Sequence, residues 1–116
     1  ARCGIRGLDD YASLPALILV ITIFSILTGP ILSGYSRHLE HEADRYGLEV
    51  IHGIVPNANQ VAAQSFQALG ENSLDYPYPS RLEVFWLYDH PSIPERVQFV
   101  LHYDPWGKGE EPKYVK

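Results

Sequence analysis

The segment from Tyr11 to Ser36 constrains the fold of this chain more than any other feature. Its 26 residues contain no ionisable side chain other than tyrosine. A transmembrane helix needs about 20 mostly apolar residues to cross a hydrocarbon layer of ~30 Å, and residues 14–34 meet that length. The apolar residues surround the helix instead of forming a stripe, which disfavours a one-sided soluble core. We therefore predict a transmembrane helix over 14–34, with a buried helix of a soluble protein as the alternative.

Proline and hydroxyl side chains modify this prediction only slightly. Pro15 suits a first helical turn, whereas Gly29-Pro30 predicts a kink or an interruption near the far end of the helix. The hydroxyl groups within the segment can bond to backbone carbonyls and therefore do not forbid burial in a membrane; they belong to Thr22, Ser25 and Thr28.

The composition excludes some classes of function. The formal net charge is −5, and no cluster of Lys and Arg is present, so a nucleic-acid partner is not expected. Cys3 is the only cysteine, which leaves no internal disulfide and no cysteine-based zinc site. The chain begins with Ala1 and lacks the layout of a signal peptide. We therefore expect a piece of a longer protein.

The remainder of the chain is predicted to be helical almost throughout. A helix resumes after Gly34 and stops near Ile51, because Gly53 and Pro56 prevent its continuation. A second helix is predicted at 61–69, capped by Asn57 and ending at Gly70, and a loop follows at 71–80. Residues 81–89 are predicted to form a short helix or a strand. A capping box at Ser92 and Glu95 then starts another helix, and the tail from residue 104 is predicted to be irregular.

These elements give an all-α fold in which a hydrophobic membrane helix is followed by short helices. We divide the chain into an N-terminal flank (1–13), the transmembrane-like helix (14–34), a C-terminal domain (35–106) and a tail (107–116). No internal repeat suggests a further division.

The stretch SRHLEHEADRYG, directly behind the apolar segment, is crowded with charge. On a helix, Glu40 and Asp44 are four residues apart and share a face, whereas Glu42 points elsewhere. Such a carboxylate can bind zinc while a neighbouring one orients another ligand. Charged pairs at this spacing are also common on solvated helix surfaces, so the spacing by itself leaves both interpretations open.

Other metal-binding patterns fail at specific positions. HEADR begins like H-E-x-x-H, but Arg45 occupies the position of the second histidine. His38 and His41 are three residues apart and could chelate a metal together, although we expect them, with Glu42, to be solvated. The sequence therefore predicts no complete zinc site within this chain.

The order S-R-x-x-E-x-x-A-D, from Ser36 to Asp44, resembles the second conserved motif of membrane-embedded zinc metallopeptidases. These are the CAAX prenyl proteases and their bacterial relatives, including the HtpX heat-shock proteases, with a gluzincin-type fold. The resemblance implies that an upstream H-E-x-x-H supplies two histidine ligands and a general-base glutamate. Glu40 would then be the third zinc ligand, supported by Asp44.

A second block, DHPSIPERVQF, is similar to the H-P-x-x-x-x-R segment of the same family. By position, the resemblance implies that His90 stabilises the oxyanion and that Arg96 assists near the site or the substrate backbone. A preset donor beside a developing oxyanion contributes about 10²–10³ in rate. The alternatives are a turn histidine before proline and an arginine in a surface ion pair.

Together the two blocks predict the C-terminal part of an integral-membrane zinc endopeptidase of the CAAX prenyl protease type. Its partners would be a polypeptide substrate and membrane lipid, with possible self-association through the hydrophobic helix. Because H-E-x-x-H is absent, the chain alone is expected to be inactive. The alternatives are an HtpX-like protease for membrane protein quality control and a non-catalytic, membrane-anchored interaction module.

Overall fold

The computed structural model describes Gly4, residues 6–7 and residues 9–116; Cys3 and part of the predicted N-terminal flank lie outside them. Within these residues the chain is helical and contains no strand, which confirms the all-α prediction. The helices are α1 (Ser13–Ile51), α2 (Ala58–Ser73), α3 (Arg81–Leu87), α4 (Ile93–His102) and α5 (Pro105–Lys108).

Helix α1 joins the apolar segment and the charged motif in one uninterrupted element of 39 residues. Pro30 lies inside it, so of the predicted kink or interruption at Gly29-Pro30 the interruption does not occur. Proline removes only one backbone hydrogen bond of the helix. The helical segments before and after Pro30 therefore remain one continuous helix. The hydroxyls of Thr22 and Thr28 bond to the carbonyls of Ile18 and Phe24, each at 2.8 Å, as the sequence predicted.

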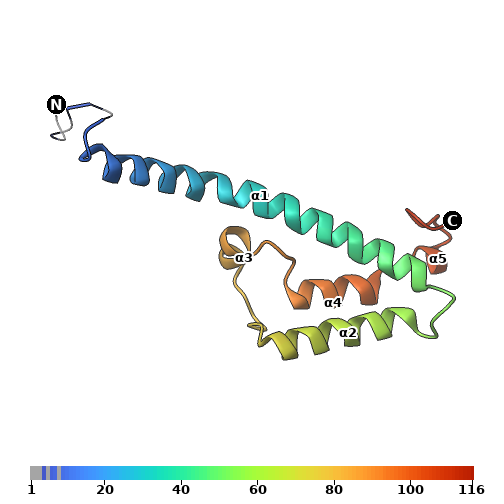
Figure 1. Cartoon of the computed structure of the whole chain (residues 1–116). Helices are drawn as coiled ribbons and strands as arrows, with labels where there is room; N and C mark the ends of the chain where they lie inside the picture. Colours follow the sequence, from blue (N-terminus) through green and yellow to red (C-terminus); the bar gives the residue numbers. More distant parts are fainter. Residues whose placement is uncertain (1–3, 5, 8) are drawn as a thin grey trace.

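The apolar part of α1 has few neighbours in the chain. By length and composition α1 could cross a membrane, and only 6% of its most apolar window is buried. Figure 1 shows this half of the helix extending away from the shorter helices. In the part of the chain that the structure describes, this segment is therefore exposed and contributes little to the core.

The small core lies at the opposite end, where α1 meets α2 and α4. It is built from buried Leu48, Ala58, Ala63 and Val100. Helices α2 and α4 lie side by side beneath the end of α1 (Figure 1). They pack closely at Gly70, where an added Cβ would lie 3.1 Å from the side chain of Ile93. Gly70 lies inside α2, which continues to Ser73. The prediction that the helix ends at Gly70 is therefore wrong by three residues.

The helix starts show both confirmed and mistaken predictions. The capping box at Ser92 and Glu95 is present, and the Glu95 carboxylate accepts from the Ser92 N–H at 3.1 Å. Asn57 does precede α2, but it adopts a left-handed conformation (φ 54°) and its side chain makes no capping bond. Asparagine tolerates this conformation, so its contribution is to turn the chain.

Helix α3 settles the choice between helix and strand at residues 81–89. Ser80 and Glu83 form a second capping box, in which the Glu83 N–H donates to the Ser80 hydroxyl at 3.2 Å and the Ser80 N–H donates to the Glu83 carboxylate at 2.7 Å. The order S-x-x-E at this position is the sequence signal that favours the helix over the strand. In the predicted irregular tail, residues 105–108 form one helical turn, α5.

Candidate functional site

The structure brings together the four predicted site residues, which come from two distant parts of the sequence. Glu40 and Asp44 lie one turn apart on α1. His90 lies in the loop between α3 and α4, and Arg96 lies in α4. His90 Nδ1 is 3.2 Å from Glu40 Oε1, and Arg96 Nη2 is 2.5 Å from Asp44 Oδ1. The predicted common face of Glu40 and Asp44 is therefore the face that meets α4 and its preceding loop.

Asp44 and Arg96 form a two-pronged ion pair below the surface. Arg96 Nε donates to Asp44 Oδ2 at 2.8 Å, beside the second contact through Nη2. The side chain of Asp44 is 7% exposed and that of Arg96 is 14% exposed. The guanidinium also lies 4.2 Å from the ring centre of Phe66. The geometry is typical of Arg–carboxylate recognition and fixes the direction of Arg96.

Glu40 is the accessible carboxylate of the pair. Its side chain is 35% exposed, and Oε2 lies 3.7 Å from Arg96 Nη2. It lines a cavity of about 370 Å³ together with His90, Arg96, Tyr88 and Tyr76. A carboxylate oxygen that is oriented by its neighbours and open to a cavity is a suitable ligand for a divalent cation.

His90 borders the same cavity and is exposed. Its Nδ1 faces Glu40, and its Nε2 lies 3.4 Å from Asp89 Oδ1. Pro91 and the capped start of α4 follow it directly, so the loop backbone is restrained on that side. The imidazole therefore lies at the rim of the cavity, with its two ring nitrogens facing the carboxylates of Glu40 and Asp89.

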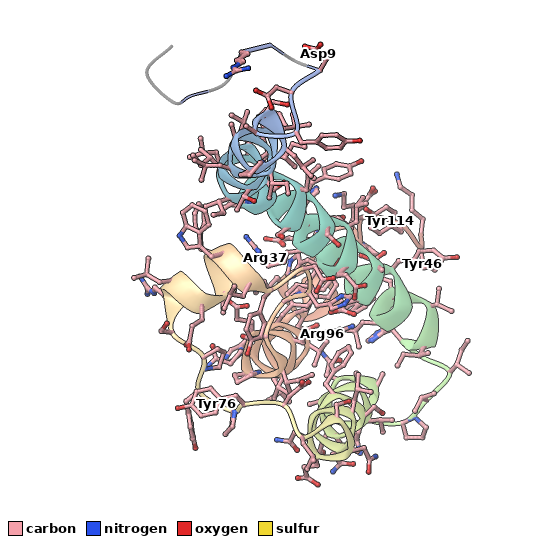
Figure 2. The ribbon with its side chains drawn as sticks, turned by 60° about the vertical axis from the view of Figure 1, so that its left-hand side comes forward. Asp9, Arg37, Tyr46, Tyr76, Arg96 and Tyr114 are labelled. Carbon is pink, nitrogen blue, oxygen red and sulfur yellow. The ribbon has the colours of Figure 1, made fainter. Side chains whose placement is uncertain are left out.

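Arg37 holds the loop that carries His90, a role for which the sequence contained no signal. Its Nη1 donates to the carbonyls of Val84 and Tyr88 at 2.9 and 2.5 Å. Figure 2 shows Arg37 where α1 and α3 meet, and Arg96 deeper among the helices. Arg37 therefore attaches the end of α3 to α1, because it bonds one carbonyl in the last turn of α3 and one at its C-cap residue.

The remaining charged residues of the motif do not complete a metal site. Among residues 4, 6–7 and 9–116, no three side chains of His, Cys, Asp or Glu converge in a way that could hold a metal ion. His38 is exposed, whereas His41 packs its ring 4.1 Å from that of Phe99. The prediction of a solvated His41 is wrong because α4 covers this side of α1.

Glu42 was also predicted to be solvated, and this too is wrong. Its side chain is 16% exposed and accepts from Arg45 at 2.8 Å, from Lys113 at 2.6 Å and from the Tyr114 hydroxyl. The hydrogen bond from Lys113, followed by that from Tyr114, lowers the pKa of Glu42 to about 2. The sequence could not indicate this, because the tail residues follow Glu42 by about 70 positions.

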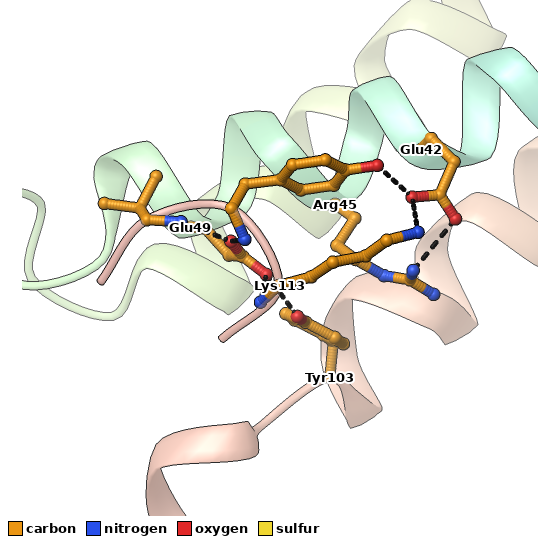
Figure 3. A network of polar contacts seen from close by, with 7 residues as sticks. Glu42, Arg45, Glu49, Tyr103 and Lys113 are labelled. Atoms are coloured by element: carbon orange, nitrogen blue, oxygen red, sulfur yellow. Dashed lines mark hydrogen bonds and ion pairs between the residues drawn. The ribbon is translucent and has the colours of Figure 1, made fainter. Parts of the chain in front are cut away.

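The C-terminal tail is held by a second carboxylate of α1, Glu49, which is 2% exposed. Glu49 accepts from the backbone N–H groups of Lys113, Tyr114 and Val115 at 2.9, 2.6 and 2.9 Å, and from the Tyr103 hydroxyl (Figure 3). Burial alone would raise the pKa of Glu49, but these donors outweigh it and lower the pKa. Burial, with the adjacent carboxylate, raises the pKa of Tyr103 to about 12.

Two comparisons with known proteins identify relatives of this chain. The model of peptidase family M48 matches residues 3–104. An uncharacterized metalloprotease of Bacillus subtilis (strain 168), YhfN, is 33% identical over 94 residues, which is 81% of this chain and 21% of the relative. The chain thus spans about a fifth of the length of that relative. No solved structure matches.

Proposed function

This chain belongs to peptidase family M48, and from that premise we propose that it forms part of a membrane-bound, zinc-dependent endopeptidase. In this proposal Glu40 is the third zinc ligand, and two histidines from elsewhere in the intact protein complete the site. The observation that carries the proposal is the position of Glu40. It is an accessible carboxylate 3.2 Å from His90 at the edge of a cavity, one turn from the buried pair of Asp44 and Arg96.

The donor chemistry fits zinc. Carboxylate oxygens bind this metal together with histidine nitrogens in catalytic sites, which keep one position open. When bound, zinc would supply Lewis-acid activation of a peptide carbonyl and of the attacking water. Asp44 accepts hydrogen bonds from two nitrogens of the Arg96 guanidinium. Its contribution is therefore to hold Arg96 in place beside Glu40.

His90 and Arg96 act on the substrate side of this proposed site. His90 donates a hydrogen bond to the oxygen of the peptide carbonyl as negative charge develops on it. The support for this role is its exposed ring, which lies beside the cavity next to Glu40. Arg96 stays fixed by Asp44 and Phe66, 3.7 Å from Glu40, where its charge assists near the substrate backbone.

Membrane insertion through α1 is the second part of the proposal. Its support is the exposed apolar run, which is long enough to span the hydrocarbon layer. The partners would be a polypeptide substrate and lipid. Within the family we propose the CAAX prenyl protease type, with the HtpX type as the alternative, because the two sequence blocks do not separate them. Cleavage of prenylated peptides in preference to unfolded membrane segments would support the CAAX type, and the opposite preference would support the HtpX type.

The chain by itself should not hydrolyse peptides, since one carboxylate does not make a catalytic zinc site. The residues before Ala1 in the intact protein decide between an enzyme and the non-catalytic interaction module. An H-E-x-x-H helix there supports the enzyme, and its absence supports the module.

The role of His90 can be tested in the intact protein with His90→Ala. We expect kcat to fall about 10²–10³-fold, with zinc content retained, because an oxyanion donor acts on the transition state. His38→Ala is the control, since His38 is an exposed histidine of the first motif and does not line the cavity that His90 borders. An unchanged kcat for His90→Ala would remove this residue from the proposed mechanism.

A further inference from the structure

Helix α3 presents an apolar face that the described chain leaves uncovered. Leu82, Phe85 and Trp86 are spaced i, i+3 and i+4 and therefore lie on one side of the helix. Their exposed fractions are 72%, 48% and 41%. The rings of Phe85 and Trp86 contact each other edge to face, with their centres 5.5 Å apart. So much exposed aromatic and aliphatic surface on seven residues indicates an interaction surface.

The place of α3 in the fold indicates what covers this face. Arg37 is the first charged residue after the uncharged segment of α1, and it holds α3 through the carbonyls of Val84 and Tyr88. Helix α3 therefore lies at the level where α1 would leave the hydrocarbon. The last apolar side chains of α1 before that level are exposed as well, namely Ile31, Leu32 and Tyr35.

The direction of α3 also suits a membrane surface. In Figure 1, α3 is seen almost end-on, whereas α1 runs lengthwise across the same view. The axis of α3 is thus steeply inclined to that of α1. If α1 crosses a bilayer, a helix transverse to it at the exit level lies along the bilayer plane, as interfacial amphipathic helices do.

We propose that α3 is an interfacial helix that places Leu82, Phe85 and Trp86 in the boundary between lipid headgroups and acyl chains. Tryptophan is enriched at this depth because its ring is both apolar and able to donate a hydrogen bond. This inference rests on the proposed membrane insertion of α1. It adds a second lipid contact, which fixes the depth of the Arg37 junction and hence of the loop that carries His90.

The two tryptophans of the chain provide an internal test. Trp106 is half-buried, stacks on His52 with ring centres 3.4 Å apart, and follows α4 at the far end of the domain. Trp106→Phe leaves Trp86 as the reporter, and Trp86→Phe leaves Trp106. Each variant of the full chain is placed in phosphatidylcholine vesicles with and without brominated acyl chains. We expect a strong loss of emission from Trp86 in brominated vesicles and little loss from Trp106.

A third reporter separates this inference from the membrane proposal on which it rests. Phe24→Trp, combined with Trp86→Phe and Trp106→Phe, places the probe in the middle of α1. Quenching in α1 without quenching of Trp86 would overturn the interfacial role of α3 and indicate that protein covers its face. If neither Trp86 nor the tryptophan introduced in α1 is quenched, the proposed membrane insertion of α1 is overturned as well. Equal quenching of Trp86 and Trp106 would also contradict the proposal, because the domain would then enter lipid without a preferred face.

Discussion

At the residue scale, Glu40 and Asp44 are one helical turn apart but have different surroundings. Asp44 is 7% exposed and bound by the Arg96 fork, whereas Glu40 is 35% exposed and faces a cavity. A buried carboxylate held by an arginine fork is less available to a metal than an exposed one. Glu40, the more exposed carboxylate, is the more available of the two, which supports the ligand role proposed for it and the supporting role proposed for Asp44.

Asp44→Asn should destabilise the domain, because it removes the charge of the carboxylate that pairs with both prongs of the Arg96 guanidinium below the surface. Breaking one side of a buried pair costs about 3–5 kcal/mol. Thermal unfolding of the chain in detergent micelles, followed by circular dichroism, measures the loss. Asp9→Asn is the control, since Asp9 is exposed and precedes α1. Equal melting temperatures for the two variants would show that the pair does not stabilise the domain.

Glu49→Gln should loosen the C-terminal tail and lower stability at pH 7 by about 1.5–3 kcal/mol, because hydrogen bonds to a buried charge are lost. The exposed Glu71 supplies the control, Glu71→Gln. Amide hydrogen exchange at residues 113–115, whose N–H groups contact Glu49, measures the release of the tail. Unchanged protection of these amides would show that the hydrogen bonds to Glu49 do not hold the tail in place.

The stability that Glu49 contributes by binding the tail depends on pH with a definite sign. The folded pKa of Glu49 lies below its ordinary value of 4.5. Its contribution is therefore fully present above pH 4.5 and is lost as the pH falls through the folded pKa. The difference in melting temperature between the parent chain and Glu49→Gln should shrink as the pH is lowered below 4.5. A difference that grows on acidification would contradict this.

At the element scale, the parts of the fold that depend on neighbouring residues were predictable. The uncharged run gave the apolar part of α1, and S-x-x-E gave the start of α4. The end of α2 was not predictable, because Gly70 serves close packing against Ile93 and not helix termination. The tail contacts of Glu42 and Glu49 were missed for the same reason: their partners are far away in the sequence.

Two glycines in helix interiors test whether Gly70 serves close packing between helices. Gly47→Ala should raise stability by about 0.5–1 kcal/mol, because alanine favours the helix and a Cβ at Gly47 meets no atom within 4 Å. Gly70→Ala should lack this gain, since its Cβ would press on both Cγ atoms of Ile93 at 3.1 Å. Melting temperatures of the two variants give the comparison. A larger gain at Gly70 would show that α2 and α4 are not closely packed there.

At the scale of the whole molecule, the chain is elongated, with dimensions of 69 × 30 × 20 Å. One half of α1 projects away from the other described helices, and the other half carries the helical domain (Figure 1). The sequence predicted the residues of the candidate site and the common face of Glu40 and Asp44. It could not predict that Arg37 secures the loop of His90 or that Arg96 binds Asp44, because these contacts depend on the packing of α3 and α4 against α1.

The exposed half of α1 should make the chain associate in plain buffer. Side chains such as Phe24, which is 67% exposed, avoid water only by contact with lipid, detergent or another copy. Light scattering after size-exclusion chromatography should show oligomers in buffer and a single protomer per detergent micelle. A monodisperse monomer in plain buffer would count against membrane insertion of residues 14–34.

The zinc content of the purified intact protein tests the assignment of Glu40 most directly. It is measured by elemental analysis for the parent protein, for Glu40→Gln and for Glu42→Gln. Glu42 is a carboxylate of the same helix that binds the tail instead of facing the cavity. We expect Glu42→Gln to retain its zinc and Glu40→Gln to lose most of it together with proteolysis. Undiminished zinc and proteolysis in Glu40→Gln would contradict the proposed site.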